Sequence, residues 1–484
     1  MSDLHFQDAH ALATQVRDKK ISALELTDLM IARIESIDPE LNAVVVRDFE
    51  RARSTARARD EAAAAGRLEG PLHGVPVTVK ESYNITGLPT TWGLPILKNN
   101  IAQDNALAVD RLQAAGAIFL GKTNVPVGLS DIQSYNEIYG QTNNPWDPLR
   151  TPGGSSGGSA AALAAGLTAL ECGSDIAGSI RTPAHYCGVY GHKPTWGIFP
   201  PQGHAVPGQV AGSDLAVCGP LARSAEDLAL ALELIAGPEP LEAPGWRLEL
   251  PAPPKKKLDE YRVALWMNED IAPVSSEISA RVQEVGEILS RLGAVVSETA
   301  RPDIELQRSN QNYMKLLNSV MSAALPMDVY EALGQKAQVF DPQDRSDEAI
   351  MARSHVLSHR EWISANNTRA RIRHAWRSFF SDWDILICPQ VATVAFPHNH
   401  ASPIWDRQID VDGQSRPYTE QFFWSGLVTG AYLPSTSFPT GPNSEGLPIG
   451  LQAIGDAYQD RSTIDFARLL TREIGGFQAP PRCR

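Results

Sequence analysis

Two short stretches of small residues contain serines whose surroundings suit nucleophilic chemistry. The first, residues 153–159, reads GGSSGGS, and the second, residues 173–181, reads GSDIAGSIR. Ser179 precedes a predicted helix, where unpaired N–H groups and the helix dipole favour negative charge. A turn of this kind can hold the oxyanion that forms when a serine attacks a carbonyl group.

A serine nucleophile needs a base, and the sequence offers a lysine or several histidines. Lys80 ends the apolar run GVPVTVK, and a lysine buried there can lose its charge and act as a neutral base. The alternative is a strand-end lysine that reaches solvent. His73, His185 and His192 lie nearest to the two stretches, and we interpret each as a hydrogen-bonded structural residue. The G-x-S-x-G and H-E-x-x-H patterns are absent, so neither a nucleophile elbow nor a metal hydrolase is indicated.

The glycine-rich stretch 151–166 has other interpretations. A P-loop requires a lysine after the glycines to reach the terminal phosphates, and none follows here. A dinucleotide fingerprint requires a preceding strand, which the sequence does not indicate, although Asp175 lies at a suitable distance. A flexible linker seldom runs directly into an alanine-rich helix. These residues alone are also compatible with a purely structural role, as a tight turn that packs on that helix.

The overall composition limits the classes of function. The net charge of −13 repels phosphate backbones and anionic lipid, so we expect no nucleic-acid or membrane partner. The five cysteines are widely spaced without a CxxC pair, which indicates free thiols rather than a disulfide framework or a zinc site. The first residues lack the pattern of a signal peptide, and no apolar run reaches the roughly 18 residues of a membrane span. We therefore expect a cytoplasmic protein without cofactor or metal.

Periodicity and capping signals predict the elements along the chain. Residues 1–65 are helical, with a capping box at Ser22 and a stop at Asp38-Pro39. Farther along, short β-branched runs alternate with helices, which favours an α/β fold with a buried mixed sheet. The expected strands are 75–79, 117–120, 263–266 and 294–298, and the expected helices are 106–115, 160–170 and 276–292.

Lys80 and the two serine stretches together resemble the motif of the amidase signature family of serine hydrolases. Further blocks are similar to the same family, namely 122–126 (KTNVP), 141–148 (QTNNPWDP), 186–197, 219–228 and 444–455. The resemblance and the α/β alternation predict one α/β/α layered domain around a mixed, largely parallel, twisted β-sheet. Its expected segments are N-terminal helices 1–65, a catalytic core 71–230, a surface excursion 237–258 and the remainder 259–484 of a single domain 1–484.

The resemblance implies a Ser-Ser-Lys triad. Ser179 would attack the carbonyl carbon, Ser155 would relay its proton, and a neutral Lys80 would accept that proton and help return it to the leaving amine. A cis peptide bond would precede Ser155. The oxyanion would be held by the N–H groups of four consecutive residues, Ile176, Ala177, Gly178 and Ser179.

Two positions depart from the family pattern, because Ala177 replaces a usual glycine and Glu81 replaces a usual aspartate. Ser156 and Asp175 are expected to hold the loop by hydrogen bonds, and Arg181 to anchor the structure. Leu129 would contribute to the wall of the acyl site. Apolar and aromatic residues that suggest a hydrophobic acyl or aryl group, but fit a protein core equally well, are Trp92, Ile132, Tyr135, Phe199, Trp405, Phe422, Phe423 and Trp424.

The leading functional hypothesis is an amidase that hydrolyses a small apolar or aryl carboxamide, anilide, ester or carbamate, with a small-molecule substrate as its partner. A homodimer is a further expectation. The first alternative is the glutamine-hydrolysing A subunit of a tRNA-dependent amidotransferase. In that protein an acid binds the ammonium group of glutamine, and Phe422 occupies the matching position here. The second alternative is a binding protein that retains the fold without chemistry.

Overall fold

The computed structural model describes residues 4–323, 325–401 and 403–484. Its helices are α1 (Ala9–Arg17), α2 (Ala23–Leu41), α3 (Phe49–Ala64), α4 (Leu107–Ala114), α5 (Gly157–Ala164), α6 (Arg181–Cys187), α7 (Ala225–Ile235), α8 (Ser276–Arg291), α9 (Leu306–Ser322), α10 (Met327–Gln338), α11 (Asp347–Ser354), α12 (His359–Asp382), α13 (Phe422–Thr429) and α14 (Asp460–Ile474). Its strands are β1 (Val44–Arg47), β2 (Pro76–Lys80), β3 (Ile118–Thr123), β4 (Tyr135–Asn136), β5 (Gly140–Gln141), β6 (Leu170–Asp175), β7 (Tyr190–Lys193), β8 (Val217–Ala222), β9 (Arg262–Leu265), β10 (Val295–Ser297), β11 (Ile385–Cys388), β12 (Gln408–Val411), β13 (Gln414–Pro417), β14 (Ser435–Pro442) and β15 (Pro448–Ile454).

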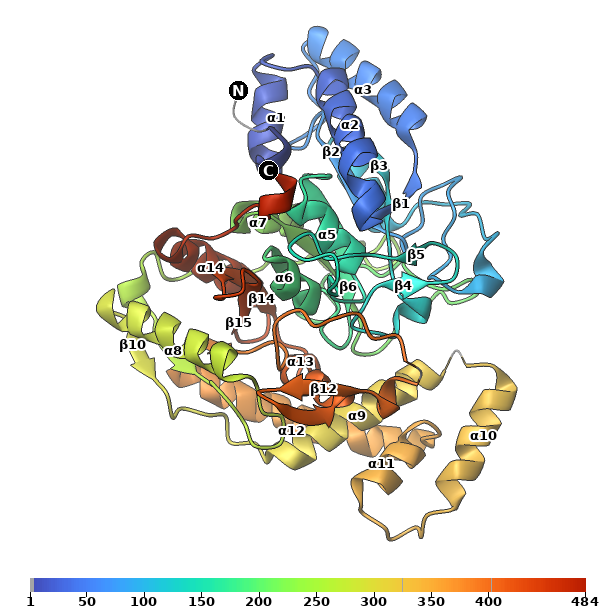
Figure 1. The fold of residues 1–484 in the computed structure, drawn as a ribbon, viewed down its shortest axis with the longest axis vertical. Coiled ribbons are helices and arrows are strands. Elements are labelled where there is room, and N and C mark those ends of the chain that lie inside the picture. The colour runs from blue at the N-terminus through green and yellow to red at the C-terminus, as the bar shows by residue number, and fades with distance from the viewer. Residues whose placement is uncertain (1–3, 324, 402) are drawn as a thin grey trace.

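An eight-stranded mixed sheet forms the centre of the molecule, in the order β10-β9-β11-β15-β14-β7-β8-β6 (Figure 1). A separate three-stranded sheet has the order β1-β3-β2, and β2 lies alongside the edge strand β6. Helices α5 and α6 pack together on the large sheet, and α7 packs with α14 on β8 and β14. The expected α/β architecture of helices around a mixed sheet is therefore confirmed.

The expectation that the sheet is largely parallel is wrong. Only β10–β9 and β9–β11 pair in parallel, whereas the other neighbours in the large sheet pair antiparallel. The crossover from β6 through α6 to β7 does connect two parallel strands, but β8 returns from the segment 194–216 and inserts antiparallel between them. Strands β14 and β15 form a hairpin, which requires antiparallel pairing.

Local signals set most of the helix and strand positions. Ser22 begins α2 with the expected capping box, because its hydroxyl accepts from Glu25 N–H and the Glu25 carboxylate accepts from Ser22 N–H. The predicted stop at Asp38-Pro39 is wrong, since α2 continues to Leu41. Pro39 costs a single hydrogen bond in the last turn, and the helix ends at Asn42, whose φ of 55° is left-handed.

The predicted strand–helix–strand unit near residue 263 is confirmed as β9, α8 and β10, with β9 and β10 parallel. The predicted helix 160–170 instead begins at Gly157 and ends at Ala164, because Gly166 takes a left-handed turn with φ of 71°. Strand β1 lies within the stretch that we expected to be helical. Its four residues VVVR are too short a run to outweigh the helical pattern on either side.

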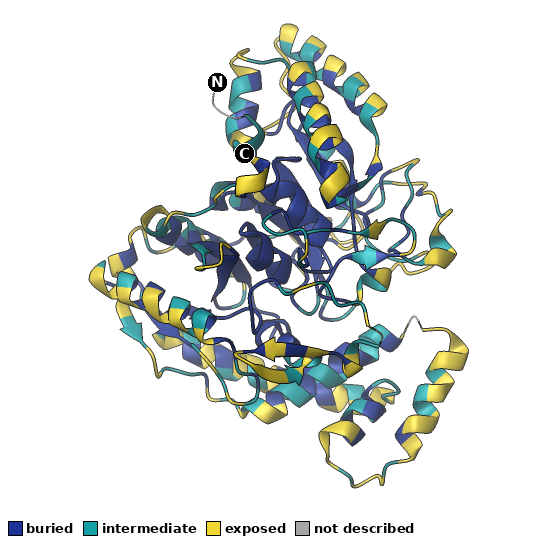
Figure 2. Ribbon diagram, viewed as in Figure 1, coloured by how far each residue is buried: buried dark blue, intermediate teal, exposed yellow. Residues whose placement is uncertain are grey.

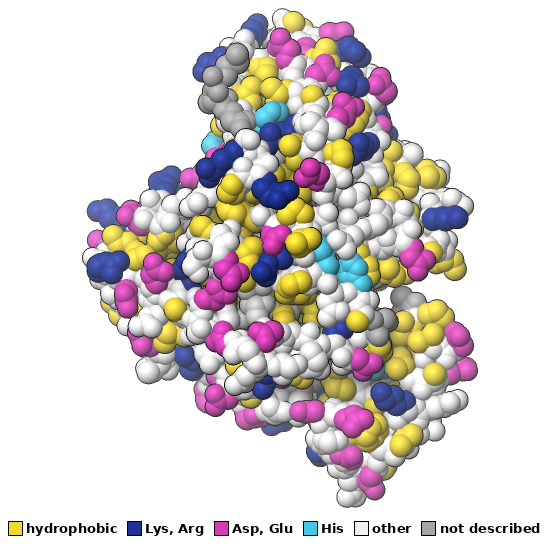
Figure 3. Space-filling model, in the orientation of Figure 1, with side chains coloured by type: hydrophobic (Ala, Val, Ile, Leu, Met, Phe, Trp, Pro, Cys, Tyr) yellow, Lys and Arg dark blue, Asp and Glu magenta, His cyan; other side chains and the backbone are white. Residues whose placement is uncertain are grey.

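Burial is concentrated in the large sheet and in α5 and α6, whereas the outer faces of α3, α8 and α10 are exposed (Figure 2). One contiguous apolar core includes buried residues from Ala9 to Cys483. All five cysteines are free and buried, as the spacing predicted. Basic and acidic side chains are interspersed over the face drawn in Figure 3. Among the helices in the described ranges, none combines the length and apolar character that a bilayer span requires.

Candidate active site

Lys80 lies at the end of β2 and points into the protein, where it is fully buried. Its Nζ is 2.6 Å from Ser155 Oγ and 3.0 Å from Ser174 Oγ. A strand-end lysine that reaches solvent is therefore not what the structure contains. Ser155 follows a cis peptide bond from Gly154, as the family resemblance implied.

Burial lowers the pKa of Lys80 from its ordinary 10.5 to about 7. Desolvation disfavours the ammonium form, and the nearby Asp175 only partly offsets this effect. No carboxylate makes a hydrogen bond with the Lys80 amine within the described residues. A substantial fraction of the amine is therefore neutral near pH 7 and can accept a proton from a hydroxyl group.

The amine at the end of β2 contacts two other chain segments, through Ser155 and through Ser174 of β6. Ser155 lies just before α5, and Ser179 lies in the loop between β6 and α6. The N–H group of Ser156 donates to Ser179 O at 3.1 Å, which places the two serine stretches side by side. Ser155 is 1% exposed and Ser179 is 7% exposed, so both serines are buried, whereas Ile176 and Ala177 in the same loop are partly exposed.

In the loop from Ile176 to Ser179, some N–H groups have a hydrogen-bond acceptor and others have none. Gly178 N–H donates to Asp175 Oδ1 at 2.9 Å, so the prediction that Gly178 serves as an oxyanion donor is not supported in this structure. Gly178 O accepts from Thr182 N–H at 2.7 Å. Within the described part of the chain, the N–H groups of Ile176, Ala177 and Ser179 have no hydrogen-bond acceptor. These three groups are available to a negatively charged oxygen.

A buried ion pair between Arg181 and Asp175 stabilises this loop. The Arg181 guanidinium donates two hydrogen bonds to Asp175, both at 3.0 Å, and both side chains are fully buried. Burial by itself raises the pKa of Asp175, but the charge and hydrogen bonds of Arg181 lower it to about 2. Arg181 also donates to Gln452 Oε1 at 2.9 Å. Asp175 and Arg181 therefore hold the loop from the buried interior of the protein.

An apolar cluster adjoins the loop 176–179. Ile176 and Ala177 pack against it, together with Trp196. Trp196 stacks on Tyr432 with ring centroids 4.5 Å apart. The buried members of this apolar cluster are Ile132, Leu215, Tyr313, Leu316, Leu317, Ala365, Tyr418, Phe422 and Tyr432. The Ile176–Ala177 part of the loop therefore borders a largely apolar region of the protein.

The predicted substrate-contacting residues fall into two groups. Ile132 and Phe422 belong to the apolar cluster, whereas Leu129 and Trp92 do not. Leu129 ends a short 3₁₀ turn, and Trp92 lies beside it, because Trp92 O accepts from Gly128 N–H. Among the other aromatic candidates, Phe199, Phe423 and Trp424 belong to the main core, Trp405 is 68% exposed, and Tyr135 stacks on His400.

The histidines that we interpreted as structural have partners away from the lysine. His185 contacts the carbonyl oxygens of Gly450 and Thr393, and His192 contacts Thr436 and Asp460. His73 contacts the carbonyl oxygen of Arg59. None of the three therefore contacts either serine of the site.

Two residues that were not among the predicted ones contact the site. Ser174, which contacts the Lys80 amine, lies within the stretch 173–181, so the sequence motif could have indicated it as a candidate. Tyr313 lies on α9 and donates its hydroxyl to Ile176 O at 3.0 Å. No motif surrounds Tyr313, and only the folding of α9 over the loop reveals this contact.

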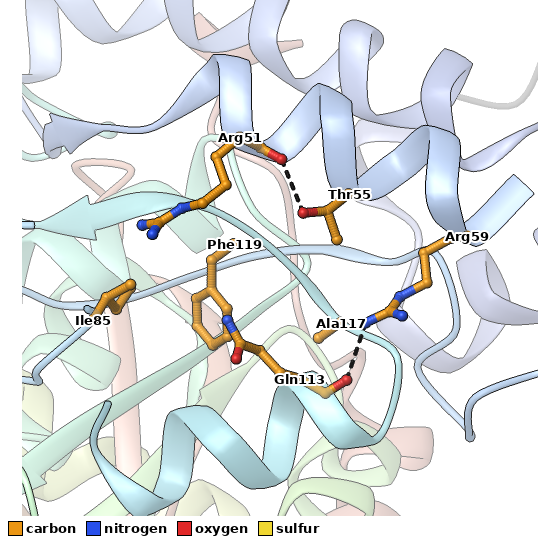
Figure 4. Close-up of a pocket in the computed structure, with 7 residues that line it drawn as sticks. All are labelled: Arg51, Thr55, Arg59, Ile85, Gln113, Ala117 and Phe119. Atoms are coloured by element: carbon orange, nitrogen blue, oxygen red, sulfur yellow. Dashed lines mark hydrogen bonds between the residues drawn. The ribbon is translucent and has the colours of Figure 1, made fainter. Parts of the chain in front are cut away.

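A cavity of about 260 Å³ lies elsewhere, between α3 and α4 (Figure 4). Arg51 and Arg59 line it, but their guanidinium groups are already paired with Asp48 and Glu69. It contains neither the lysine nor the serines. Among the residues that the structure describes, no group of three or more His, Cys, Asp or Glu side chains could hold a metal ion.

Comparison with known proteins connects this geometry to a family. The model of the Amidase family matches residues 25–464. An acylamidase from Rhodococcus erythropolis is 33% identical over 93% of this chain and 92% of its own length. The A subunit of the glutamyl-tRNA(Gln) amidotransferase from Moorella thermoacetica is 32% identical over 96% of each chain.

The fold agrees with this assignment. The structure of a 6-aminohexanoate cyclic dimer hydrolase in complex with its substrate superposes with a TM-score of 0.80 at 26% identity, and the match covers all of both chains. The family match spans most of the sequence and includes Lys80 and both serine stretches. The chain therefore belongs to the amidase signature family and is a hydrolase of amide carbon–nitrogen bonds.

Proposed function

We propose that this enzyme hydrolyses small amides with an apolar or aryl acyl group through an acyl-enzyme on Ser179. The observation that carries the proposal is the buried hydrogen bond of 2.6 Å between Lys80 Nζ and Ser155 Oγ. It supplies a base and a relay hydroxyl next to the segment that contains Ser179. The apolar cluster beside the loop supports the choice of acyl group.

In the proposed reaction, Ser179 Oγ attacks the carbonyl carbon and its proton passes through Ser155 to the neutral Lys80 amine. The negative charge on the former carbonyl oxygen is stabilised by main-chain N–H groups of the loop. When the C–N bond breaks, the proton returns to the leaving amine. Water then attacks the ester of Ser179, with the same relay acting as base, and releases the acid.

Fluorophosphonate labelling tests the nucleophile. The wild-type protein should gain one phosphonyl group by intact-mass analysis, and Ser179→Ala should gain none. Ser290→Ala is a matched control, because Ser290 lies on α8 and its hydroxyl donates within that helix, to Gly286 O. Labelling of Ser179→Ala at the wild-type rate would show that another residue is the nucleophile. A wild-type protein that is never labelled would instead support a binding protein without chemistry.

A substrate panel tests the acyl group. Amides, anilides, esters and carbamates of graded acyl size should give kcat/KM values that rise from acetyl to larger apolar or aryl groups. Free glutamine should release little ammonia, because Phe422 and its apolar neighbours provide no carboxylate for the ammonium group. Efficient ammonia release from glutamine would favour the role of an amidotransferase component instead. Association into a homodimer also stays a proposal.

A further inference from the structure

We infer that Tyr313 is a positioning residue, which orients the Ala177 N–H group toward the oxyanion. The inference rests on the proposed function, since it concerns the same reaction at Ser179. Tyr313 belongs to α9, lies 137 residues from Ile176 in the sequence, and donates its hydroxyl to Ile176 O at 3.0 Å. Its side chain is only 2% exposed.

The peptide bond explains how a contact with Ile176 acts on Ala177. The carbonyl oxygen of Ile176 and the N–H of Ala177 belong to one planar trans peptide unit, so they point in opposite directions. A hydrogen bond that holds the oxygen toward α9 therefore directs the N–H away from α9. Ala177 N–H has no acceptor of its own among the described residues, so no other hydrogen bond orients it.

The neighbouring peptide units of the loop are held by other groups. The unit between Ala177 and Gly178 is fixed by Asp175, which accepts from Gly178 N–H at 2.9 Å. The unit between Gly178 and Ser179 is fixed by Thr182, whose N–H donates to Gly178 O at 2.7 Å. Both of these anchors come from the same segment of chain as the loop. Tyr313 supplies the corresponding anchor for the first unit, from a distant helix.

Packing holds the Tyr313 ring independently of its hydroxyl. The ring lies against two glycines of the α13 segment: a Cβ atom added at Gly426 would be 2.5 Å from ring carbons, and one at Gly430 would be 3.3 Å from Tyr313 Cβ. Burial raises the pKa of the Tyr313 phenol, so the hydroxyl keeps its proton and remains a donor. Removal of the hydroxyl alone should therefore leave the ring in place and free only the Ile176–Ala177 peptide unit.

Tyr313→Phe tests this role with an anilide that the wild type hydrolyses. We expect kcat to fall about tenfold with KM nearly unchanged, because the stabilisation lost is that of the oxyanion; complete loss of an oxyanion donor costs about 10² to 10³ in rate. The rate of inactivation by a fluorophosphonate should fall by a similar factor, since that reaction also places negative charge on an oxygen beside Ser179.

Tyr190→Phe is the matched control, because Tyr190 is also buried and its phenol contacts Thr471, away from the loop. It should change the melting temperature about as much as Tyr313→Phe does, with kcat close to the wild-type value. The inference would be overturned if Tyr313→Phe kept the wild-type kcat or changed KM alone. It would also be overturned if both variants lost the same fraction of kcat. Failure of the proposed function itself is distinct, because the wild type would then neither hydrolyse the anilide nor be labelled.

Discussion

Lys80 is the residue whose titration should control the activity. Its amine is buried, contacts two hydroxyl groups and has a pKa lowered to about 7 by burial. Only the neutral amine can accept the proton of the nucleophile. Protonation therefore removes the base, and activity should be present above the pKa and lost as the pH falls through it.

We predict that kcat/KM for an amide substrate rises with pH through about 7 and levels off above about 8, because this parameter reports the ionisation of the free enzyme. In Lys80→Met the rate should fall about 10² to 10⁴-fold and the step near pH 7 should disappear. Lys193→Met is the matched control, because Lys193 is a second buried lysine whose pKa burial lowers to about 7. A step that survives in Lys80→Met but not in Lys193→Met would show that Lys193, rather than Lys80, is the titrating base.

The loop between β6 and α6 depends on a neighbouring helix for its shape. Gly178 has a φ of 101°, a conformation that favours glycine, and it packs against α13. A Cβ atom at Gly178 would lie 2.4 Å from Ser425 Oγ and 2.8 Å from Thr182 Oγ1. The loop 176–179 and α13 therefore fit together only because residue 178 has no side chain.

Gly178→Ala should lower both stability and the labelling rate of Ser179. The free energy of unfolding should fall by about 1–3 kcal/mol, as for other overpacked sites, and urea unfolding measures it. In the double variant with Ser425→Ala, part of that loss should be recovered, because the oxygen that meets the new Cβ is gone. Strictly additive effects of the two substitutions would show that the contact with Ser425 is not the cause.

At the scale of the whole molecule, one apolar core connects the N-terminal helices to the last residues. Buried residues from Ala9 to Cys483 belong to the same cluster. The lysine, the two serine stretches and Tyr313 come from β2, from the segments before α5 and α6, and from α9. These segments are far apart in the sequence and, with the common core, agree with the proposal of a single domain.

We predict that urea unfolds the protein in one transition, with the same midpoint by far-UV circular dichroism and by tryptophan fluorescence. Loss of Ser179 labelling should follow the same curve. Two separate midpoints would contradict the single-domain proposal and divide the chain into independent units. The experiment is repeated at several protein concentrations, because a midpoint that rises with concentration would indicate the proposed homodimer.

Local patterns of sequence determined the candidate chemistry. The small residues around Ser155 and Ser179 and the apolar strand before Lys80 are contiguous motifs, as is the capping box at Ser22. Their physical signals act over a few residues, so they can be interpreted without a fold. The same is true of β9, α8 and β10, whose periodicity and length predicted a strand–helix–strand unit.

Tertiary structure alone decided how those groups are used. Antiparallel β8 inserts between β6 and β7, which no local pattern indicates, because strand pairing depends on long-range contacts. The Gly178 N–H group donates a hydrogen bond to Asp175, and the Tyr313 hydroxyl donates to the carbonyl oxygen of Ile176, 137 residues away in the sequence. The sequence names the residue types that can act, but burial and the direction of each hydrogen bond arise only when distant segments pack together.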